Sequence, residues 1–355
     1  MIKGRKMDRR LLYIICVVLF FMACSRDEVK SDKDKILIDV QGVKGLSKAG
    51  LIEDVDDMVD EKEFTINAYL TDGVDTRYME DVWVYYFNGD WRFRDRVNQS
   101  NLIDYYWPND RKLNFVAYMP HDLDKTVVDD TDISFSSSTG ISINCTLPDV
   151  IDDITDADSI RLASQREFIY AYRKNQGNES GVVSLRFIHP FSAVKFKLKQ
   201  SHRDLRINYI MLQNICNSAR YVNDNDTYVA YPTDQDALTY ERWTSIAAPS
   251  TMTINIGKIV PGDINFDSDI GAYHLVIPQA LTSVKLIVNY TWDGVTQTSP
   301  AVAISTPAVT AWQPGMKYVY SLNLGDNKEE ILFKVDVEEW EKGEDEGYEN
   351  DYDVQ

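Results

Sequence analysis

Histidine, cysteine and serine carry much of the catalytic and metal chemistry of proteins, but their spacing in this sequence predicts none of it. The four histidines, at 121, 189, 202 and 274, form no His-x-x-x-His pair, and no Cys-x-x-Cys motif occurs. The sequence also contains no Gly-x-Ser-x-Gly nucleophile elbow. His189, which precedes Pro190 between two apolar stretches, has the setting of a structural histidine. We therefore predict no catalytic residue, no metal site and no cofactor.

One acidic stretch has part of the pattern of a calcium loop. Asp263-Ile-Asn-Phe-Asp-Ser-Asp269 places oxygen-bearing side chains at alternate positions, as such a loop does. Ser268, however, stands where the loop needs glycine, and His274 stands where it needs a closing glutamate. The pattern favours a polar loop over a calcium site.

Cys24 is the residue whose position most clearly suggests chemistry. Basic residues precede an uncharged apolar run, Leu11 to Ala23, and this is the layout of a secretory signal peptide over residues 1–23. Thirteen helical residues span only about 20 Å, too little to cross a bilayer core. Phe21-Met22-Ala23-Cys24 resembles the lipobox of bacterial lipoproteins, in which the cysteine is lipidated and becomes the new N-terminus. Residues 24–35, polar and mostly charged, would then form a tether on the cell outer membrane.

Charge and cysteine content exclude several classes of protein. The 355 residues include 37 basic and 56 acidic side chains, for a formal net charge of −19, so the surface repels nucleic-acid phosphates. Beyond Cys24 only Cys145 and Cys216 remain, too few for a disulfide-dense scaffold. They are either free thiols or one bridge. Free thiols are favoured because the two residues fall in different predicted domains.

Apolar residues recur mainly with a period of two, which predicts strands. In Phe64–Leu70 four apolar residues share one face, and Val194–Lys199 alternates strictly between apolar residues and lysine, so both are expected to be half-buried strands. Turn residues separate such runs, as at Asn88-Gly89-Asp90. Only short stretches, around Ile160–Ala163 and Arg203–Asn208, could be helical. The pattern predicts an all-β fold of antiparallel sandwiches.

The mature chain is long enough for two domains. A break rich in Asn, Gln and Gly at 175–181 lies near its middle and gives the predicted boundary. We expect one sandwich over 36–180, a second over 181–340, and a solvated acidic tail over 341–355.

Several phrases resemble, in order, the fimbrillin-like proteins of Bacteroidota. They are Tyr106-Trp107-Pro108, Leu113 to Pro120, Phe168 to Ala171, Val183 to Val194, Leu275 to Gln279, Trp312 to Tyr320 and Val335 to Trp340. The resemblance implies two transthyretin-like β-sandwich domains in tandem. It also implies export as a lipoprotein to the outer membrane and assembly into a fimbrium by strand exchange between subunits, without a cofactor.

In that mechanism a protease removes the first strand, and a neighbour's C-terminal strand fills the groove. The strand that would be displaced contains Ile36, Leu37, Ile38 and Val40. No arginine occurs between Arg26 and Arg77, so cleavage is expected at Lys44 or Lys48, or not at all. The donor would present Ile331, Phe333, Val335 and Val337 on one face, although the same strand could instead complete the subunit's own sheet.

A different function remains open. The chain could be a surface lipoprotein that does not polymerise and binds a glycan or a host protein through aromatic residues such as Trp91, Trp243 or Trp292. Tryptophans of this kind more often anchor a core. A tip adhesin would combine both functions.

Overall fold

Strands account for nearly all the regular structure in this computed structural model. It describes residues 34–40, 63–72, 76–95, 102–119, 128, 133–136, 140–152, 167–200, 205–223, 239–260, 263–270, 272–324 and 331–339. The helices among these residues are two single 3-10 turns, η3 (Asn178–Ser180) and η4 (Tyr240–Arg242). In this part of the chain no helix has the length and apolar character needed to span a membrane.

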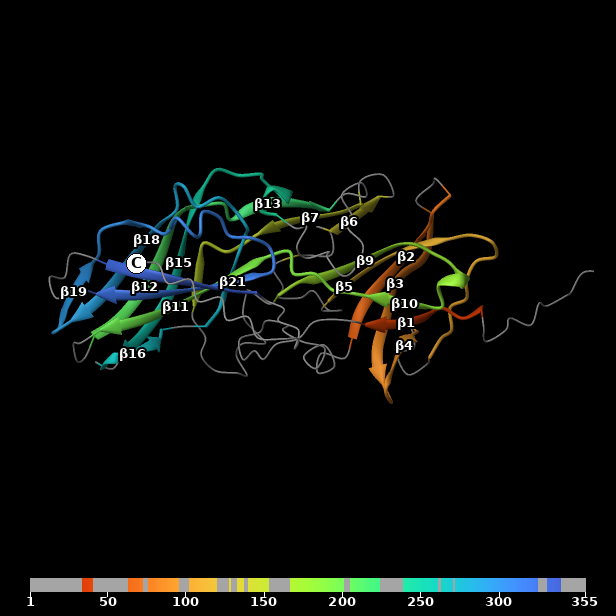
Figure 1. The fold of residues 1–355 in the computed structure, drawn as a ribbon, viewed down its shortest axis with the longest axis horizontal. Coiled ribbons are helices and arrows are strands. Elements are labelled where there is room, and N and C mark those ends of the chain that lie inside the picture. The colour runs from red at the N-terminus through yellow and green to blue at the C-terminus, as the bar shows by residue number, and fades with distance from the viewer. Residues whose placement is uncertain are drawn as a thin grey trace, which may run out of the picture. The chain divides into compact units, whose positions relative to one another are not determined.

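The first large sheet has the strand order β4-β3-β2-β5-β9 (Figure 1). Its strands are β2 (Glu63–Leu70), β3 (Arg77–Phe87), β4 (Asp90–Arg94), β5 (Leu113–Met119) and β9 (Ile169–Gln176). A two-stranded parallel sheet of β1 (Leu37–Val40) and β10 (Val182–Leu185) shares a hydrophobic core with it. We call this core, which extends from Ile36 to Phe187, the N-terminal core.

Two further sheets enclose a second hydrophobic core, which includes Phe196, Ile210, Leu286 and Trp312 and which we call the second core. One has the order β16-β11-β21-β22, with β17 also on β11; the other has the order β19-β18-β12-β15-β8, with β20 on β18. Their bounds are β8 (Val150–Asp152), β11 (Ser192–Gln200), β12 (Leu205–Ile215), β15 (Ser250–Val260), β16 (Asp263–Asp269), β17 (His274–Val276), β18 (Lys285–Trp292), β19 (Val295–Thr298), β20 (Val302–Ala303), β21 (Met316–Leu324) and β22 (Ile331–Glu339).

A four-stranded sheet of order β14-β13-β7-β6 packs on the other face of the first sheet. Its strands are β6 (Ile133–Ser136), β7 (Gly140–Thr146), β13 (Ser218–Asn223) and β14 (Trp243–Ser245). The phenolic oxygens of Tyr170 on β9 and Tyr221 on β13 lie 2.6 Å apart. The Tyr69 ring on β2 contacts Phe135 on β6, with a centroid separation of 4.4 Å.

The first sheet is therefore buried on both faces at its centre. Phe64, Ile66, Ala68 and Leu70 enter the N-terminal core as predicted, but Thr65, Asn67 and Tyr69 on the opposite face are also at most 6% exposed. The prediction of a half-buried strand at 64–70 is wrong, because β2 has a layer on each side. The prediction for 194–199 is confirmed in the described side chains: Val194, Phe196 and Leu198 are buried, whereas Lys195 and Lys197 are only partly so.

Two hairpins have the turn chemistry that the sequence indicates. Asn88 and Gly89 both have positive φ, 52° and 91°, which a type I′ turn requires, and they join β3 to β4. Asp293 and Gly294, with φ of 51° and 71°, do the same between β18 and β19.

The all-β class built mainly of antiparallel strand pairs is confirmed, and three pairs, β1–β10, β11–β21 and β8–β15, are parallel. The possible helix at Arg203–Asn208 is wrong where it is described, because β12 begins at Leu205. Asp263–Asp269 forms strand β16 rather than a polar loop. The possible helix at 160–163 lies outside the described residues.

The boundary predicted at 180 is crossed by three strand pairs: β10 pairs with β1, β7 with β13, and β8 with β15. Residues 36–355 form one compact unit. Cys145 on β7 pairs in register with Ala219 on β13, three residues beyond Cys216, and both cysteines are free thiols.

Candidate functional site

The first strand is a short apolar plug seated in the N-terminal core. Ile36, Ile38 and Val40 are 2%, 7% and 7% exposed, whereas Leu37, which points the other way, is 52% exposed. Strand β1 pairs with β10 alone within the described sheets, and it also lies close to β4 (Figure 1). Burial, rather than an extensive ladder, therefore holds this strand in place.

Strand β10 forms the wall against which β1 lies. Ile38 pairs with Val183 and Val40 with Leu185, and both β10 side chains are at most 1% exposed. Beyond the strand, Phe187 packs edge-on against Phe64 of β2, with ring centroids 5.3 Å apart. If β1 left, these apolar groups would line an open groove.

The segment that precedes β5 closes one end of the plug. The Ile36 amide donates to the Tyr105 carbonyl (2.8 Å), and the Tyr78 hydroxyl donates to the Tyr106 carbonyl (2.5 Å). Burial raises the pKa of Tyr78 above its ordinary value. The Trp107 ring packs edge-on against Phe115 at 5.9 Å, so the Trp-Pro phrase serves as a core anchor.

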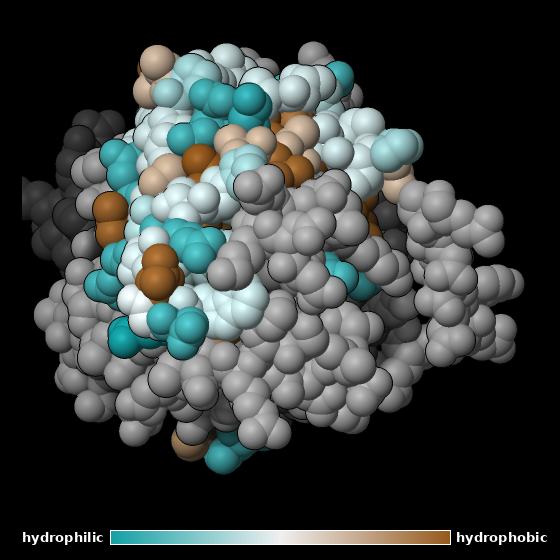
Figure 2. Space-filling model, turned by 90° about the vertical axis from the view of Figure 1, so that its left-hand side faces the viewer, coloured by the Kyte–Doolittle hydropathy of each residue, from teal (hydrophilic) through white to brown (hydrophobic). Residues whose placement is uncertain are grey.

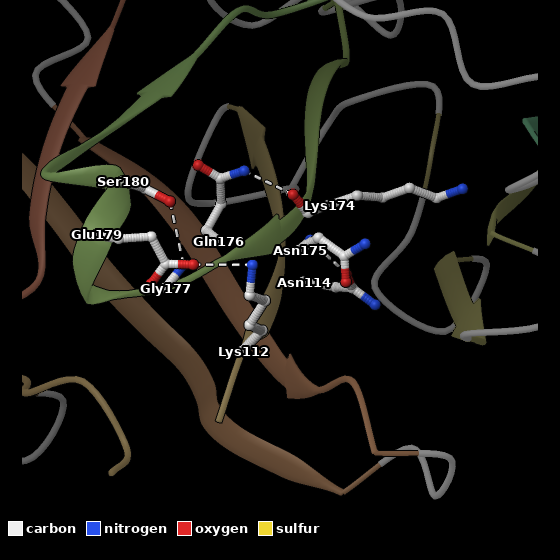
Figure 3. Close-up of polar contacts among 8 residues, drawn as sticks. All are labelled: Lys112, Asn114, Lys174, Asn175, Gln176, Gly177, Glu179 and Ser180. Atoms are coloured by element: carbon white, nitrogen blue, oxygen red, sulfur yellow. Dashed lines mark hydrogen bonds and ion pairs between the residues drawn. The ribbon is translucent and has the colours of Figure 1, made fainter. Parts of the chain in front are cut away.

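A tight polar turn sets where β10 begins, as Figure 3 shows. The Ser180 hydroxyl accepts from the Gly177 amide at 3.1 Å, and the Lys112 ammonium pairs with the Glu179 carboxylate at 2.8 Å. The hydrogen bond from Lys112 lowers the pKa of Glu179. The stretch predicted as the domain boundary contains this turn, which is closed by Gly181 at a φ of +69°.

Asn175 completes this turn. It has a positive φ of 55°, and its backbone N–H donates to the side-chain oxygen of Asn114 on β5 (3.0 Å; Figure 3). The turn therefore fixes the end of β9, and with it the start of the groove wall.

The last strand, β22, pairs with β21 in antiparallel register over its whole length. Val335 lies opposite Tyr320 and Val337 opposite Tyr318. Val335 is half-buried, but Asp336 is exposed and Val337 is 42% exposed. The described side chains of β22 are therefore buried less deeply than the inward side chains of β1.

Strand β21, by contrast, is firmly fixed. The Trp312 indole donates to the Tyr320 hydroxyl at 2.9 Å, and the backbone N–H of Gln313 donates to the Tyr318 hydroxyl at 2.8 Å. Burial raises the pKa of Tyr318 to about 12, and that of Tyr320 also rises because of burial. Gly315, with a φ of 70°, lies in the turn before β21, and both tyrosines are buried on the inner face.

Several predicted site residues lie outside the described part of the chain. These are the signal peptide, Cys24, residues 24–33 of the tether, Lys44, Lys48 and the acidic tail, together with the side chains of Ile331 and Phe333. Of the strand residues, Leu37, Ile38 and Val40 lie on β1 with Ile36 directly before it, and Val335 and Val337 lie on β22.

Buried polar groups here are structural. His189 and Glu167 are fully buried, and the His189 Nδ1 lies 2.6 Å from a Glu167 carboxylate oxygen. His274 is also buried, which lowers its pKa to about 4. Within the described ranges no group of three His, Cys, Asp or Glu side chains is arranged to hold a metal ion.

The three tryptophans considered for binding are anchored in cores. Trp243 is 8% exposed and its indole donates to the Pro190 carbonyl at 2.9 Å. Trp91 contacts Phe64 at 5.1 Å between ring centroids, and Trp292 packs against the second core. Figure 2 views the end of the molecule that carries β19, where hydrophobic residues lie among hydrophilic ones on the described surface.

Sequence reasoning identified the inward face of the first strand but not its partner. Val183-Ser-Leu-Arg-Phe187 alternates like a core strand, and this was the available signal for β10. Placing a domain boundary just before it assigned β10 to the other sandwich.

A family model described as Fimbrillin-like matches residues 57–340. The chain belongs to the fimbrillin-like family. Membership supports a fimbrial-type role for this fimbrillin-like protein.

Solved structures agree in fold. The fimbrillin-like protein is similar to a fimbrial protein from Bacteroides vulgatus ATCC 8482, with 17% identity, a TM-score of 0.51, and coverage of 86% of this chain and 99% of the other. It is also similar to a candidate cell adhesion protein from Bacteroides uniformis ATCC 8492, with 14% identity, a TM-score of 0.51, and coverage of 88% and 100%. No curated protein gives a significant match.

Proposed function

We propose that this fimbrillin-like protein is exported as a lipoprotein of the outer membrane, anchored through Cys24, and polymerises into a fimbrium by strand exchange. In the proposed reaction β1 leaves its groove and the β22 strand of a neighbouring subunit takes its place. The observation that carries the proposal is the seating of β1. Its alternate side chains fill the N-terminal core, and among the described strands it pairs with β10 alone.

Burial energy supports the direction of exchange. Fully burying an aliphatic side chain is worth roughly 1.5–3 kcal/mol, so a groove without Ile36, Ile38 and Val40 would be less stable by several kcal/mol. On β21, Val335 is only half-buried and Val337 is 42% exposed. Moving β22 into an empty groove would bury them more deeply and satisfy the open backbone groups of β10.

A cut between β1 and β2 would start the process. Lys44 and Lys48 lie in the sequence that connects these strands, and cleavage there would separate β1 and the lipid on Cys24 from the rest of the chain. The exchanged subunit would then be held in the fimbrium by neighbouring subunits rather than by lipid.

The N-terminus and assembly state of protein taken from cells test this proposal. We expect an N-terminus just after Lys44 or Lys48, and ladders in detergent that disappear only on heating. A Lys44→Gln/Lys48→Gln variant should keep a lipidated Cys24 and form no ladder. Ladders built from chains that still begin at Cys24 would refute the cleavage step.

The donor strand is tested by two substitutions that introduce the same side chain. Val335→Asn places an amide on the half-buried face of β22 and should abolish ladders, whereas Asp336→Asn changes an exposed neighbour and should leave them intact. Equal ladders from both variants would show that β22 is not the donor.

One observation favours a second candidate function, that of a permanently anchored surface lipoprotein that binds a host protein or glycan. Strand β22 already completes its own subunit's sheet on β21. Protein from cells that is monomeric, lipidated and uncut would support this candidate.

A further inference from the structure

The hairpin of β3 and β4 carries a row of aromatic residues on the face that turns away from the N-terminal core. Val82 and Val84 of β3 point into that core, so the alternate residues Trp83, Tyr85 and Phe87 share the opposite face. All three are at least partly exposed, and Phe87 is 48% exposed. The row extends over about 13 Å of strand.

Charged residues flank the row in register. On β4, Arg94 pairs with Trp83, Arg92 with Tyr85, and Asp90 with Phe87, and directly paired residues lie on one face of a sheet. We call these six residues the hairpin face. Arg92 also forms an ion pair with Asp90 at 2.7 Å.

One arginine lies across the centre of the hairpin face. The Arg94 guanidinium lies 4.0 Å from the centre of the Tyr85 ring, and it pairs with the Glu63 carboxylate on β2 at 2.7 Å. Glu63 itself pairs in register with Tyr85. The Arg94 guanidinium and the Glu63 carboxylate therefore lie beside the aromatic row. A ligand that stacked on this row would have its polar groups close to both of them.

The hairpin face is rigidly built. The type I′ turn at Asn88 and Gly89 fixes the last pair, Phe87 and Asp90, at the hairpin tip. Tyr85 and Phe87 contact each other with ring centroids 5.9 Å apart, and on the core side Tyr86 packs on Trp91 at 5.2 Å. A fixed aromatic surface loses little conformational entropy when a ligand binds.

Its charge indicates the class of ligand. The chain has a formal net charge of −19, yet two arginines on the hairpin face are balanced by Asp90 and by Glu63 beside it. A locally neutral surface attracts neither polyanions nor polycations. Sugar rings combine an apolar C–H face, which packs on aromatic rings, with hydroxyl groups, which hydrogen-bond to charged side chains.

We propose that the hairpin face binds a neutral glycan, with Trp83 and Phe87 as stacking surfaces and Arg92, Arg94 and Asp90 as hydrogen-bonding groups. The proposal is independent of strand exchange, because none of these residues lies on β1, β10 or β22. The proposed ligand is an oligosaccharide segment, since the row is longer than a single sugar.

Native electrophoresis of the detergent-solubilised full chain, in gels that contain mannan, xylan or laminarin, tests the proposal. Alginate serves as the acidic comparison. We expect at least one neutral polysaccharide to retard the protein, and alginate to have no effect. Phe87→Ala and Trp83→Ala should each weaken that binding at least tenfold, while Phe87→Trp should retain it. Circular dichroism and urea midpoints would establish that each variant is folded.

Tyr209→Ala is the matched control, because Tyr209 is a partly exposed aromatic residue on β12, outside the hairpin face. It should bind like the wild type, as should Val335→Asn, which removes polymerisation alone. The proposal is overturned if no neutral polysaccharide binds, if alginate alone binds, or if folded Phe87→Ala binds normally. Loss of self-association in Phe87→Ala, without polysaccharide binding by the wild type, would instead assign the hairpin face to contact with a second copy of the chain.

Discussion

Ile38 on β1 and Val183 on β10 pair in parallel register, and both side chains are buried in the N-terminal core. This contact makes the first strand part of the folding unit even though β1 is only four residues long. An unfilled groove would leave Val183 facing solvent. The contact with Ile38 stabilises the free subunit. Once β1 had left, a replacement strand would be required to bury Val183 again.

Ile38→Ala should lower the free energy of unfolding of the uncut chain by about 2–4 kcal/mol, the usual loss when a buried isoleucine is truncated. Leu37→Ala is the matched control, because Leu37 is 52% exposed and its removal should change stability by only about 0.5 kcal/mol or less. Urea unfolding measures both. Equal losses would show that β1 is not seated as described.

Gly181→Ala should destabilise the chain by about 1–3 kcal/mol, because Gly181 has φ of 69° and ψ of −114°, a conformation open essentially only to glycine. No atom would crowd the added methyl group, so the loss would report backbone strain alone. Gly181→Asn should be as harmful, since this ψ lies outside the left-handed region that asparagine tolerates. Ser184→Ala, nearby on β10, is the control and should be nearly neutral in urea unfolding.

Stability should fall in mild acid because of His274. Burial lowers its pKa from 6.5 to about 4, so in that interval the unfolded chain binds a proton that the folded chain does not. Stability from this group is complete above pH 6.5 and is lost as the pH falls toward 4. Between pH 7 and pH 5 the loss should be about 2 kcal/mol.

The comparison is with His274→Gln, which cannot titrate. Urea unfolding gives the free energy of unfolding at pH 7 and at pH 5. The fall between these two pH values should be smaller in this variant than in the wild type by about 2 kcal/mol. Identical pH dependence in the two proteins would refute the assignment.

Alternation and turn residues are local properties, so they were sufficient to predict some of the strands, although not β12 or β16. The strand at Phe64–Leu70, its one predicted buried face and the Asn88-Gly89 turn were predicted correctly, since a buried face and positive φ angles restrict residue type directly. The burial of the opposite face was not predicted, because it depends on a second layer. Arg203–Asn208 was considered as a helix, but from Leu205, where the description begins, pairing with β15 and β18 makes it a strand. Short segments follow tertiary context when local preference is weak.

Long-range pairing was not accessible in the same way. The inward face of β1 was predicted from its apolar residues, but the partner β10 lies about 145 residues away, and no local pattern specifies such a pair. The hairpin face was missed for a related reason. Trp83, Tyr85 and Phe87 look like ordinary strand aromatics until Val82 and Val84 are seen to fill the core.

The last prediction concerns the buried pair of Glu167 and His189, which lies where β9 and the segment after β10 meet. Ile188, the residue before His189, exchanges two backbone hydrogen bonds with Tyr170, at 2.7 and 3.2 Å. Glu167→Leu should destabilise the protein by roughly 3–5 kcal/mol, because it removes the carboxylate that accepts from a fully buried imidazole. The double variant Glu167→Leu/His189→Leu should be more stable than the sum of the single losses implies, since it removes both polar groups together. Urea unfolding of all four proteins gives this coupling, and strictly additive losses would mean that the two side chains do not stabilise the junction as a pair.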